Sequence, residues 1–196
     1  QSPTETKEFF ENTYLDPNIT RDRTTYWSLS NTVGVSLLEG FHKYAKFGLA
    51  AYITHQVRRY NMTADTLDRS DETLGLTPFP EGVSIAPSKT EQLAFVGAQL
   101  TKQRGSLLNY EATAELGILG PAAGDLRLDG AVSTRFPLMG DSLAIRAFGS
   151  FHNEEAPYLT KNYLSNHFVW QNDFGKERTV NFGGEVHYPR SGTRLA

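Results

Sequence analysis

The sequence contains no cysteine in 196 residues. Without thiols the chain cannot form disulfides, a thiolate metal site or a cysteine nucleophile. A run of about 18 apolar residues is also missing, so no transmembrane helix is expected. The net charge is only −3 and the isoelectric point is about 6.0, which gives no indication of a polyanionic partner such as nucleic acid.

The motifs of several enzyme classes are absent as well. The sequence contains no GxSxG, no phosphate-binding P-loop and no GxGxxG. Its five histidines lack the helical i, i+4 spacing of a zinc site, and the acidic run 65–72 lacks the spacing of a calcium-binding EF-hand loop. We therefore expect a protein that is not an enzyme and that carries no metal or other cofactor.

Apolar and polar residues instead alternate with a period of two, most clearly from Leu107 to Asn153. This period is typical of a β-strand with one apolar and one polar face. The runs last about ten residues, longer than the roughly 5–6 residues of ordinary strands. The sequence predicts about eight antiparallel strands in an up-and-down meander. Their approximate ranges are 24–38, 47–60, 91–101, 108–118, 126–136, 143–152, 162–172 and 179–188.

The polar face carries full charges of both signs. Long strands of this kind, joined by short turns, favour the wall of a transmembrane outer-membrane β-barrel, apolar toward lipid and charged toward a wet lumen. A soluble antiparallel sheet with its polar face in bulk water allows the same alternation. The residues predicted to line the lumen are Arg58, Glu111, Glu115, Arg127, Asp129, Arg135, Arg146 and Glu185.

Residues that pair directly across two strands must share a face, so the alternation constrains each turn. A turn centred near Pro121 places Glu115 opposite Arg127, which joins opposite charges. The phase of the strands 91–101 and 108–118 requires a turn with an odd number of residues, and the three-residue hairpin loop Gln103–Gly105 satisfies this. The phase also requires an even number between Phe136 and Asp141, for example a two-residue loop at Leu138–Met139.

The predicted organisation has three parts. Residues 1–23 form a polar connector or loop, and 24–189 form the barrel wall. The wall includes a long loop, 61–89, which is rich in proline and acidic residues. The last residues, 190–196, would begin a truncated outer loop.

The segment 114–195 resembles the putative porin family of Bacteroidota-type Gram-negative bacteria, and the resemblance extends back to Trp27, so that it covers most of the chain. The residues that carry the resemblance are the Gly124–Asp125 opening of one strand, the Thr134–Pro137 end of that strand, and the run Asn166-His167-Phe168-x-Trp170-x-Asn172. The resemblance implies an outer-membrane β-barrel and no catalytic residues. Since members form larger barrels than this chain could, it also implies an internal fragment of the barrel wall.

The expected function is passive diffusion of small solutes through the bacterial outer membrane, with lipid and solute as partners and oligomerisation left open. One alternative is a plugged barrel that binds or assembles through its loops. Another is a soluble β-sandwich or lipocalin-like binder, whose apolar face would point inward.

Overall fold

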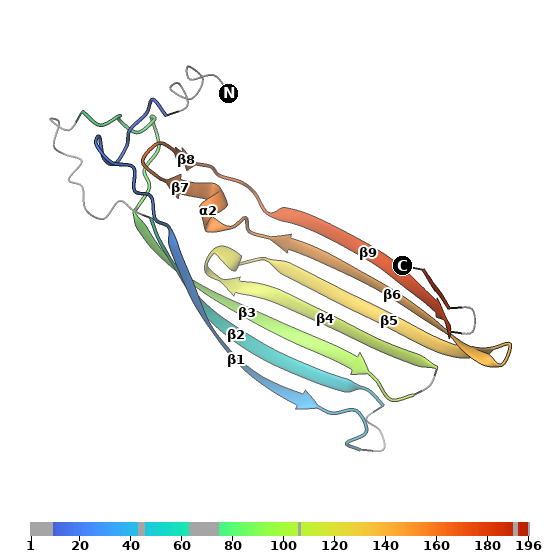
Figure 1. The fold of residues 1–196 in the computed structure, drawn as a ribbon. Coiled ribbons are helices and arrows are strands. Elements are labelled where there is room, and N and C mark those ends of the chain that lie inside the picture. Colours follow the sequence, from blue (N-terminus) through green and yellow to red (C-terminus); the bar gives the residue numbers. More distant parts are fainter. Residues whose placement is uncertain (1–9, 43–45, 63–74, 106, 190–191, 196) are drawn as a thin grey trace. The chain divides into compact units, whose positions relative to one another are not determined.

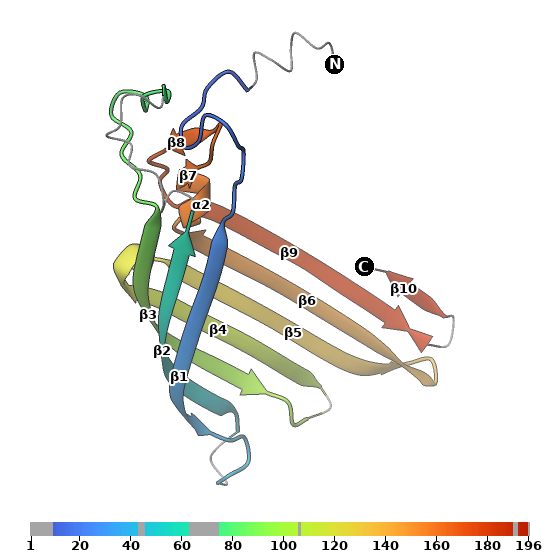
Figure 2. The ribbon, with the colours of Figure 1, turned by 60° about the vertical axis from the view of Figure 1, so that its left-hand side comes forward.

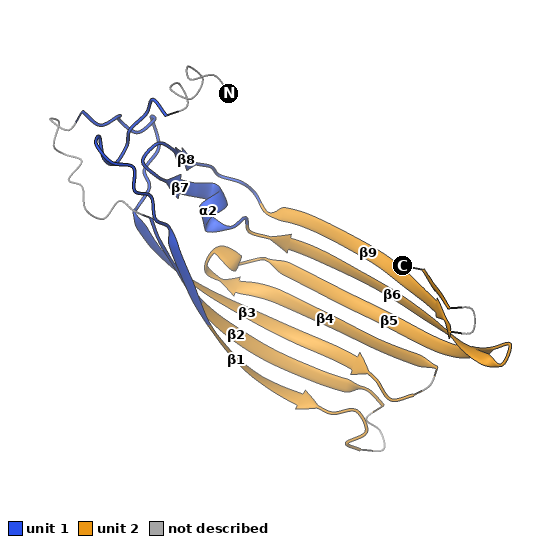
Figure 3. Cartoon of the chain, in the orientation of Figure 1, with its two compact units in different colours: residues 1–29, 57–91, 156–175 blue, residues 30–56, 92–155, 176–196 orange. Residues whose placement is uncertain are grey.

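The computed structural model describes residues 10–42, 46–62, 75–105, 107–189 and 192–195. The chain divides into two compact units, coloured separately in Figure 3. Unit 1 contains residues 1–29, 57–91 and 156–175, and unit 2 contains 30–56, 92–155 and 176–196. Strands β1, β2 and β3 contribute residues to both units.

The main sheet has eight strands in the order β1-β2-β3-β4-β5-β6-β9-β10 (Figure 1). From β3 onward every neighbouring pair is antiparallel. The predicted all-β antiparallel meander is therefore confirmed. The strands are β1 (Thr25–Leu37), β2 (Gly48–Asn61), β3 (Ser88–Lys102), β4 (Leu108–Leu119), β5 (Leu126–Leu138), β6 (Asp141–Glu154), β9 (Glu177–Tyr188) and β10 (Thr193–Leu195).

The register across β4 and β5 is the one predicted, with Glu115 opposite Arg127. The next turn contains two residues, Met139 and Gly140, so the required even number is also confirmed, one residue later than the suggested position. Both residues have positive φ, 50° and 84°. This conformation matches the twist of a two-residue hairpin and suits glycine.

The turn between β3 and β4 is longer than three residues. Lys102 pairs with Tyr110, so the odd number predicted by phase holds, but the turn takes in residues 103–107. The Glu39 carboxylate, from the β1–β2 connection, accepts the backbone N–H groups of Gln103 at 2.7 Å and Arg104 at 3.0 Å. These bonds join two turns of unit 2.

The Glu39 contact has a testable pH dependence. The N–H of Gln103 lowers the pKa of Glu39 from its ordinary value of 4.5. A lowered folded-state pKa means that the stabilisation is present above the unfolded pKa and is lost as pH falls through the folded one. We expect the amide resonances of Gln103 and Arg104 to titrate below pH 4.5, measured by NMR. Glu39→Gln should remove this titration, and an unchanged titration in that variant would contradict the assignment.

Unit 1 has a hydrophobic core of its own, assembled from segments distant in the sequence. Its elements are the single-turn helix α2 (Tyr158–Lys161) and two short strands, β7 (Asn162–Leu164) and β8 (Val169–Gln171). β7 and β8 form a hairpin that is a separate two-stranded sheet. Tyr14, Leu15, Met62, Ile85 and Leu164 are all buried there against one another. Tyr163 and Trp170 stack on the hairpin with ring centroids 4.4 Å apart.

The strand predicted over 162–172 as part of the wall is therefore wrong. Leu164, which a wall strand of this phase would place on the outward face, is only 3% exposed, and the chain reverses at Ser165–Phe168. Asn166 holds this turn against the N-terminal segment. Its Oδ1 accepts the N–H groups of Leu15 and Asp16, and its Nδ2 donates to the Asp16 carbonyl. Asn166, which interrupts the alternation of 162–172, therefore forms a buried hydrogen-bond network. A strand of the barrel wall would not place these backbone groups next to Asn166.

Replacing Asn166 should loosen unit 1. Asn166→Ala leaves buried donors and acceptors without partners, at about 1–3 kcal/mol for each group stranded. We expect a loss of roughly 2–4 kcal/mol in local stability, visible as faster hydrogen exchange at Leu15 and Asp16. Asn166→Asp keeps the acceptor oxygens and should protect these two amides better than alanine does. Equal exchange in the alanine variant and the parent would contradict this role.

The remaining regions differ from the prediction in detail. Residues 10–24 contain no strand or helix, and Tyr14 and Leu15 are buried in the core of unit 1. Within the predicted loop 61–89, residues 63–74 lie outside the described residues, while Phe79, Val83 and Ile85 pack into the same core. The tail 190–196 was expected to be a loop, yet Thr193–Leu195 pairs with β9 as β10 (Figure 2).

Candidate functional site

The sheet of unit 2 presents one polar and one apolar face, because neighbouring strands are paired in phase. On the polar face, Glu115 lies opposite Arg127 and Arg127 lies opposite His152. One residue further along these strands, Ala114, Leu128 and Phe151 are paired in the same way on the apolar face. Polar side chains from four or more strands are thus brought together although they are distant in sequence.

A belt of charged side chains crosses the polar face. The Arg127 guanidinium donates to Glu115 at 3.0 Å and also to Glu154. His152 Nε2 lies 3.1 Å from Asp129, and its Nδ1 lies 3.8 Å from Glu154. Arginine binding two carboxylates, with a histidine beside them, gives a connected network in which each group is oriented by another.

Aromatic side chains support this belt from β2 and β3. The Tyr52 hydroxyl donates to Glu115 at 3.4 Å. Tyr52 can reach across β3 because residue 97 is glycine, where an added Cβ would lie 2.2 Å from the ring. The Arg127 guanidinium also lies 5.5 Å from the centroid of the buried Phe95 ring, a cation–π contact.

A second charged group lies further along the same strands. Arg146 Nη2 is 3.8 Å from Glu111, and Arg146 is directly opposite Glu185. Glu185 in turn lies 3.8 Å from Arg194 on β10. These distances place opposite charges side by side with wide access to solvent, so each pair contributes little to stability.

The structure places seven of the eight predicted lumen-lining residues in unit 2, in phase on its polar face. Glu115 forms an ion pair with Arg127, and Glu111 forms one with Arg146. Arg135 lies opposite Ala144 near the β5–β6 turn. Arg58 is on the part of β2 that belongs to unit 1.

Four further residues on the polar face were not predicted from the sequence to line the lumen: Tyr52, Phe95, Phe148 and Glu154. Tyr52 has the phase of the polar side of its strand, but it was not among the residues predicted to line the lumen. Glu154 lies beyond the end of the predicted strand, although its phase matches that of His152. Phe95 and Phe148 are apolar residues on the polar face, so the alternation alone hides them.

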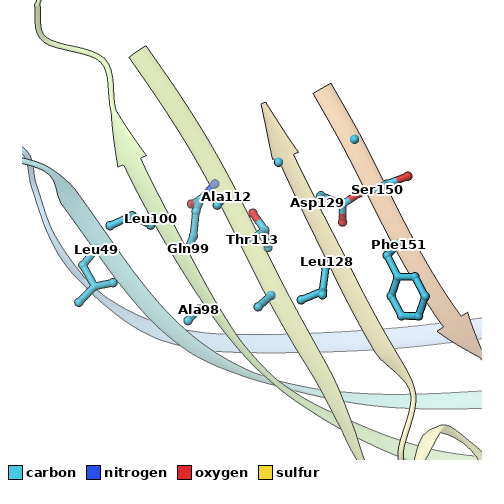
Figure 4. Close-up of a pocket in the computed structure, with 13 residues that line it drawn as sticks. Leu49, Ala98, Gln99, Leu100, Ala112, Thr113, Leu128, Asp129, Ser150 and Phe151 are labelled. Carbon is cyan, nitrogen blue, oxygen red and sulfur yellow. The ribbon is translucent and has the colours of Figure 1, made fainter. Parts of the chain in front are cut away.

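The apolar face of unit 2 is widely exposed. Large side chains on it include Val35 at 76% and Phe182 at 88% exposed, with Val33 and Val180 also exposed. Ala98, Ala112 and Gly130 leave a shallow hollow of about 530 Å³ beside Leu128 and Phe151. Figure 4 shows Leu128 and Phe151 at this hollow, with Asp129 and Ser150 on the same strands.

No group of three or more histidine or acidic residues that could hold a metal ion occurs in the part of the chain that the structure describes. Within the same residues, no helix is long and apolar enough to cross a membrane.

No curated protein and no solved structure matches the chain. The sequence profile of a family described as "putative porin" matches residues 1–196, which is the whole chain. The profile covers both the alternating strands of the sheet and the connections gathered in unit 1. The chain therefore belongs to the putative porin family.

Proposed function

We propose that this protein is a channel of the bacterial outer membrane, through which small solutes diffuse passively along the polar face of unit 2. The observation that carries the proposal is the pairing of an exposed apolar face with a charged face on the same long strands. A monomer in water rarely exposes so large an apolar surface, whereas a barrel wall presents it to lipid. The polar face would then line the lumen, and transport would need no catalytic group.

The length of the apolar face fits a bilayer. On β3 the outward apolar residues lie between Gln92 and Lys102, and on β9 they lie between Arg178 and Tyr188. Ten residues at about 3.3 Å each span roughly 33 Å along the strand. Tilted by about 40°, this becomes roughly 25 Å, the height of the apolar band of outer-membrane barrels.

The connections also support this assignment. Successive connections in an antiparallel meander alternate between the two ends of the strands. Those after β1, β3, β5 and β9 occupy residues 38–47, 103–107, 139–140 and 189–192. The alternate set, after β2, β4 and β6, includes the two longest, 62–87 and 155–176. Outer-membrane barrels carry short turns on the periplasmic side and longer loops outside, so we assign the long connections to the cell surface.

Planar-bilayer recording tests the proposal directly. Protein purified from the outer-membrane fraction in detergent should give stepwise, steady currents on insertion, with folding checked by heat-modifiable migration on gels. Folded, inserted protein that never conducts would contradict a diffusion channel. Recovery of the protein in the aqueous phase without detergent would contradict the membrane location and favour a soluble binder.

A second candidate function is a plugged barrel that binds partners through its loops. The specific observation in its favour is the core of unit 1, because long connections with a folded core present a defined surface. Absence of a steady current in folded, membrane-inserted protein would favour this candidate over the channel.

A further inference from the structure

The polar face of unit 2 also contains a hollow of about 490 Å³, to which no role has yet been assigned. Strands β4, β5, β6 and β9 all contribute to its lining. The side chains that matter here are Glu111, Thr113, Asp129, Phe148, Ser150 and Asn181. Apart from the aromatic ring, these residues offer hydroxyl, amide and carboxylate groups, and Arg146 and Glu185 add a guanidinium and a further carboxylate to the lining.

Phe148 is a large aromatic side chain that stands on the polar face and remains 42% exposed. It pairs with Ala131 on one side and with Gly183 on the other. A Cβ at Gly183 would lie 2.5 Å from the ring, so the glycine is what allows the ring to lie across β9. The Arg146 guanidinium lies 5.7 Å from the ring centroid. The part of the ring that stays exposed beside it, among hydrogen-bonding groups, is suited to a ligand with both C–H faces and polar edges.

The carboxylates around the hollow lie beside basic side chains, so they can serve as hydrogen-bond acceptors for a neutral ligand. Glu111 lies 3.8 Å from Arg146, Glu185 lies 3.8 Å from Arg194, and Asp129 lies 3.1 Å from His152. Each carboxylate thus has a basic group beside it and still has lone pairs that can accept hydroxyl protons. The Asn181 amide nitrogen donates to Ser150 Oγ at 3.3 Å, and its carbonyl oxygen can accept a hydroxyl proton.

We propose that this hollow binds a neutral oligosaccharide, with one sugar ring stacked on Phe148. Hydroxyl groups of the sugar would bond to Glu111, Asp129 and Asn181. The C–H groups on one face of a pyranose match the apolar ring, while the hydroxyl groups around its edge match the polar lining. The inference rests on the proposed function, because it gives the channel a class of solute.

Calorimetric titration of the detergent-folded protein with maltotriose, mannotriose and chitotriose tests the inference without measuring current. We expect at least one trisaccharide to bind, and Phe148→Ala to weaken that binding at least tenfold. Phe148→Trp keeps an aromatic platform and should retain binding. Phe151→Ala, on the same strand but on the apolar face, is the matched control and should bind like the parent.

Asn181→Leu provides a second test if Phe148→Ala does not fold, and we expect it to weaken binding about tenfold. Binding of none of the three sugars, or equal binding by the parent and Phe148→Ala, would overturn the inference. So would binding of spermidine in their place, lost in Glu111→Gln, which would indicate a basic solute. Steady current without sugar binding refutes only this inference, whereas sugar binding without current refutes only the channel.

Discussion

Val132→Arg should destabilise the membrane-folded protein by about 2–4 kcal/mol if the residue lies near the bilayer midplane. Val132 is in the middle of β5 and shares its face with Leu128, Ile145 and Phe182. An arginine there would place a guanidinium in hydrocarbon, without a carboxylate on the same face nearby to pair with. The free energy of unfolding of protein folded into phospholipid vesicles measures the effect.

The neighbouring position supplies a matched control. Ala131 is on the same strand but on the polar face, directly opposite Glu111. Ala131→Arg introduces the same side chain next to a carboxylate and water, so we expect it to cost less than about 1 kcal/mol. A larger cost at 131 than at 132 would mean that the polar face is the buried one, and it would refute a lipid-facing Val132.

The alternation in the sequence was sufficient to predict both the sheet and the register at Glu115 and Arg127. The reason is that a one-residue shift moves every side chain of a strand to the other face. The prediction of which residues share a face was correct even where the predicted turn length was wrong, as at residues 103–107. It also placed Arg146 and Glu185 on one face, where the structure pairs them.

The predictions that were wrong or incomplete concern features that depend on contacts between segments distant in the sequence. The hairpin at 162–171 has the same period-two pattern as a wall strand, so only the burial of Leu164 against Tyr14 and Met62 distinguishes the two. These segments are separated by many residues, and no local signal joins them. The position of the Phe148 ring could not be predicted for a related reason, since it depends on a glycine in another strand, Gly183.

Glu115→Lys should shift the ion selectivity of the channel toward anions. Glu115 forms an ion pair with Arg127 and accepts a hydrogen bond from the Tyr52 hydroxyl, so its charge has a fixed position on the polar face. The substitution raises the charge there by two units. For an ion about 7 Å away in water, each unit is worth about 0.6 kcal/mol, or roughly a threefold change in local concentration. Two units raise the local anion concentration about sevenfold and lower the local cation concentration by a similar factor, so we expect the permeability ratio of anions to cations to rise by up to about fiftyfold at low salt.

Reversal potentials in a salt gradient measure this shift, and two variants calibrate it. Glu115→Gln changes the charge by one unit and should give about half the shift in reversal potential. Asp141→Lys makes the same two-unit change on the outward face, since residue 141 pairs with Leu138 in phase with the apolar side chains. It should leave selectivity nearly unchanged. Higher salt should shrink the Glu115→Lys effect, because the Debye length falls from about 10 Å at 0.1 M to 3 Å at 1 M. An unchanged reversal potential in folded Glu115→Lys, or an equal shift in Asp141→Lys, would show that this face does not line a conducting lumen.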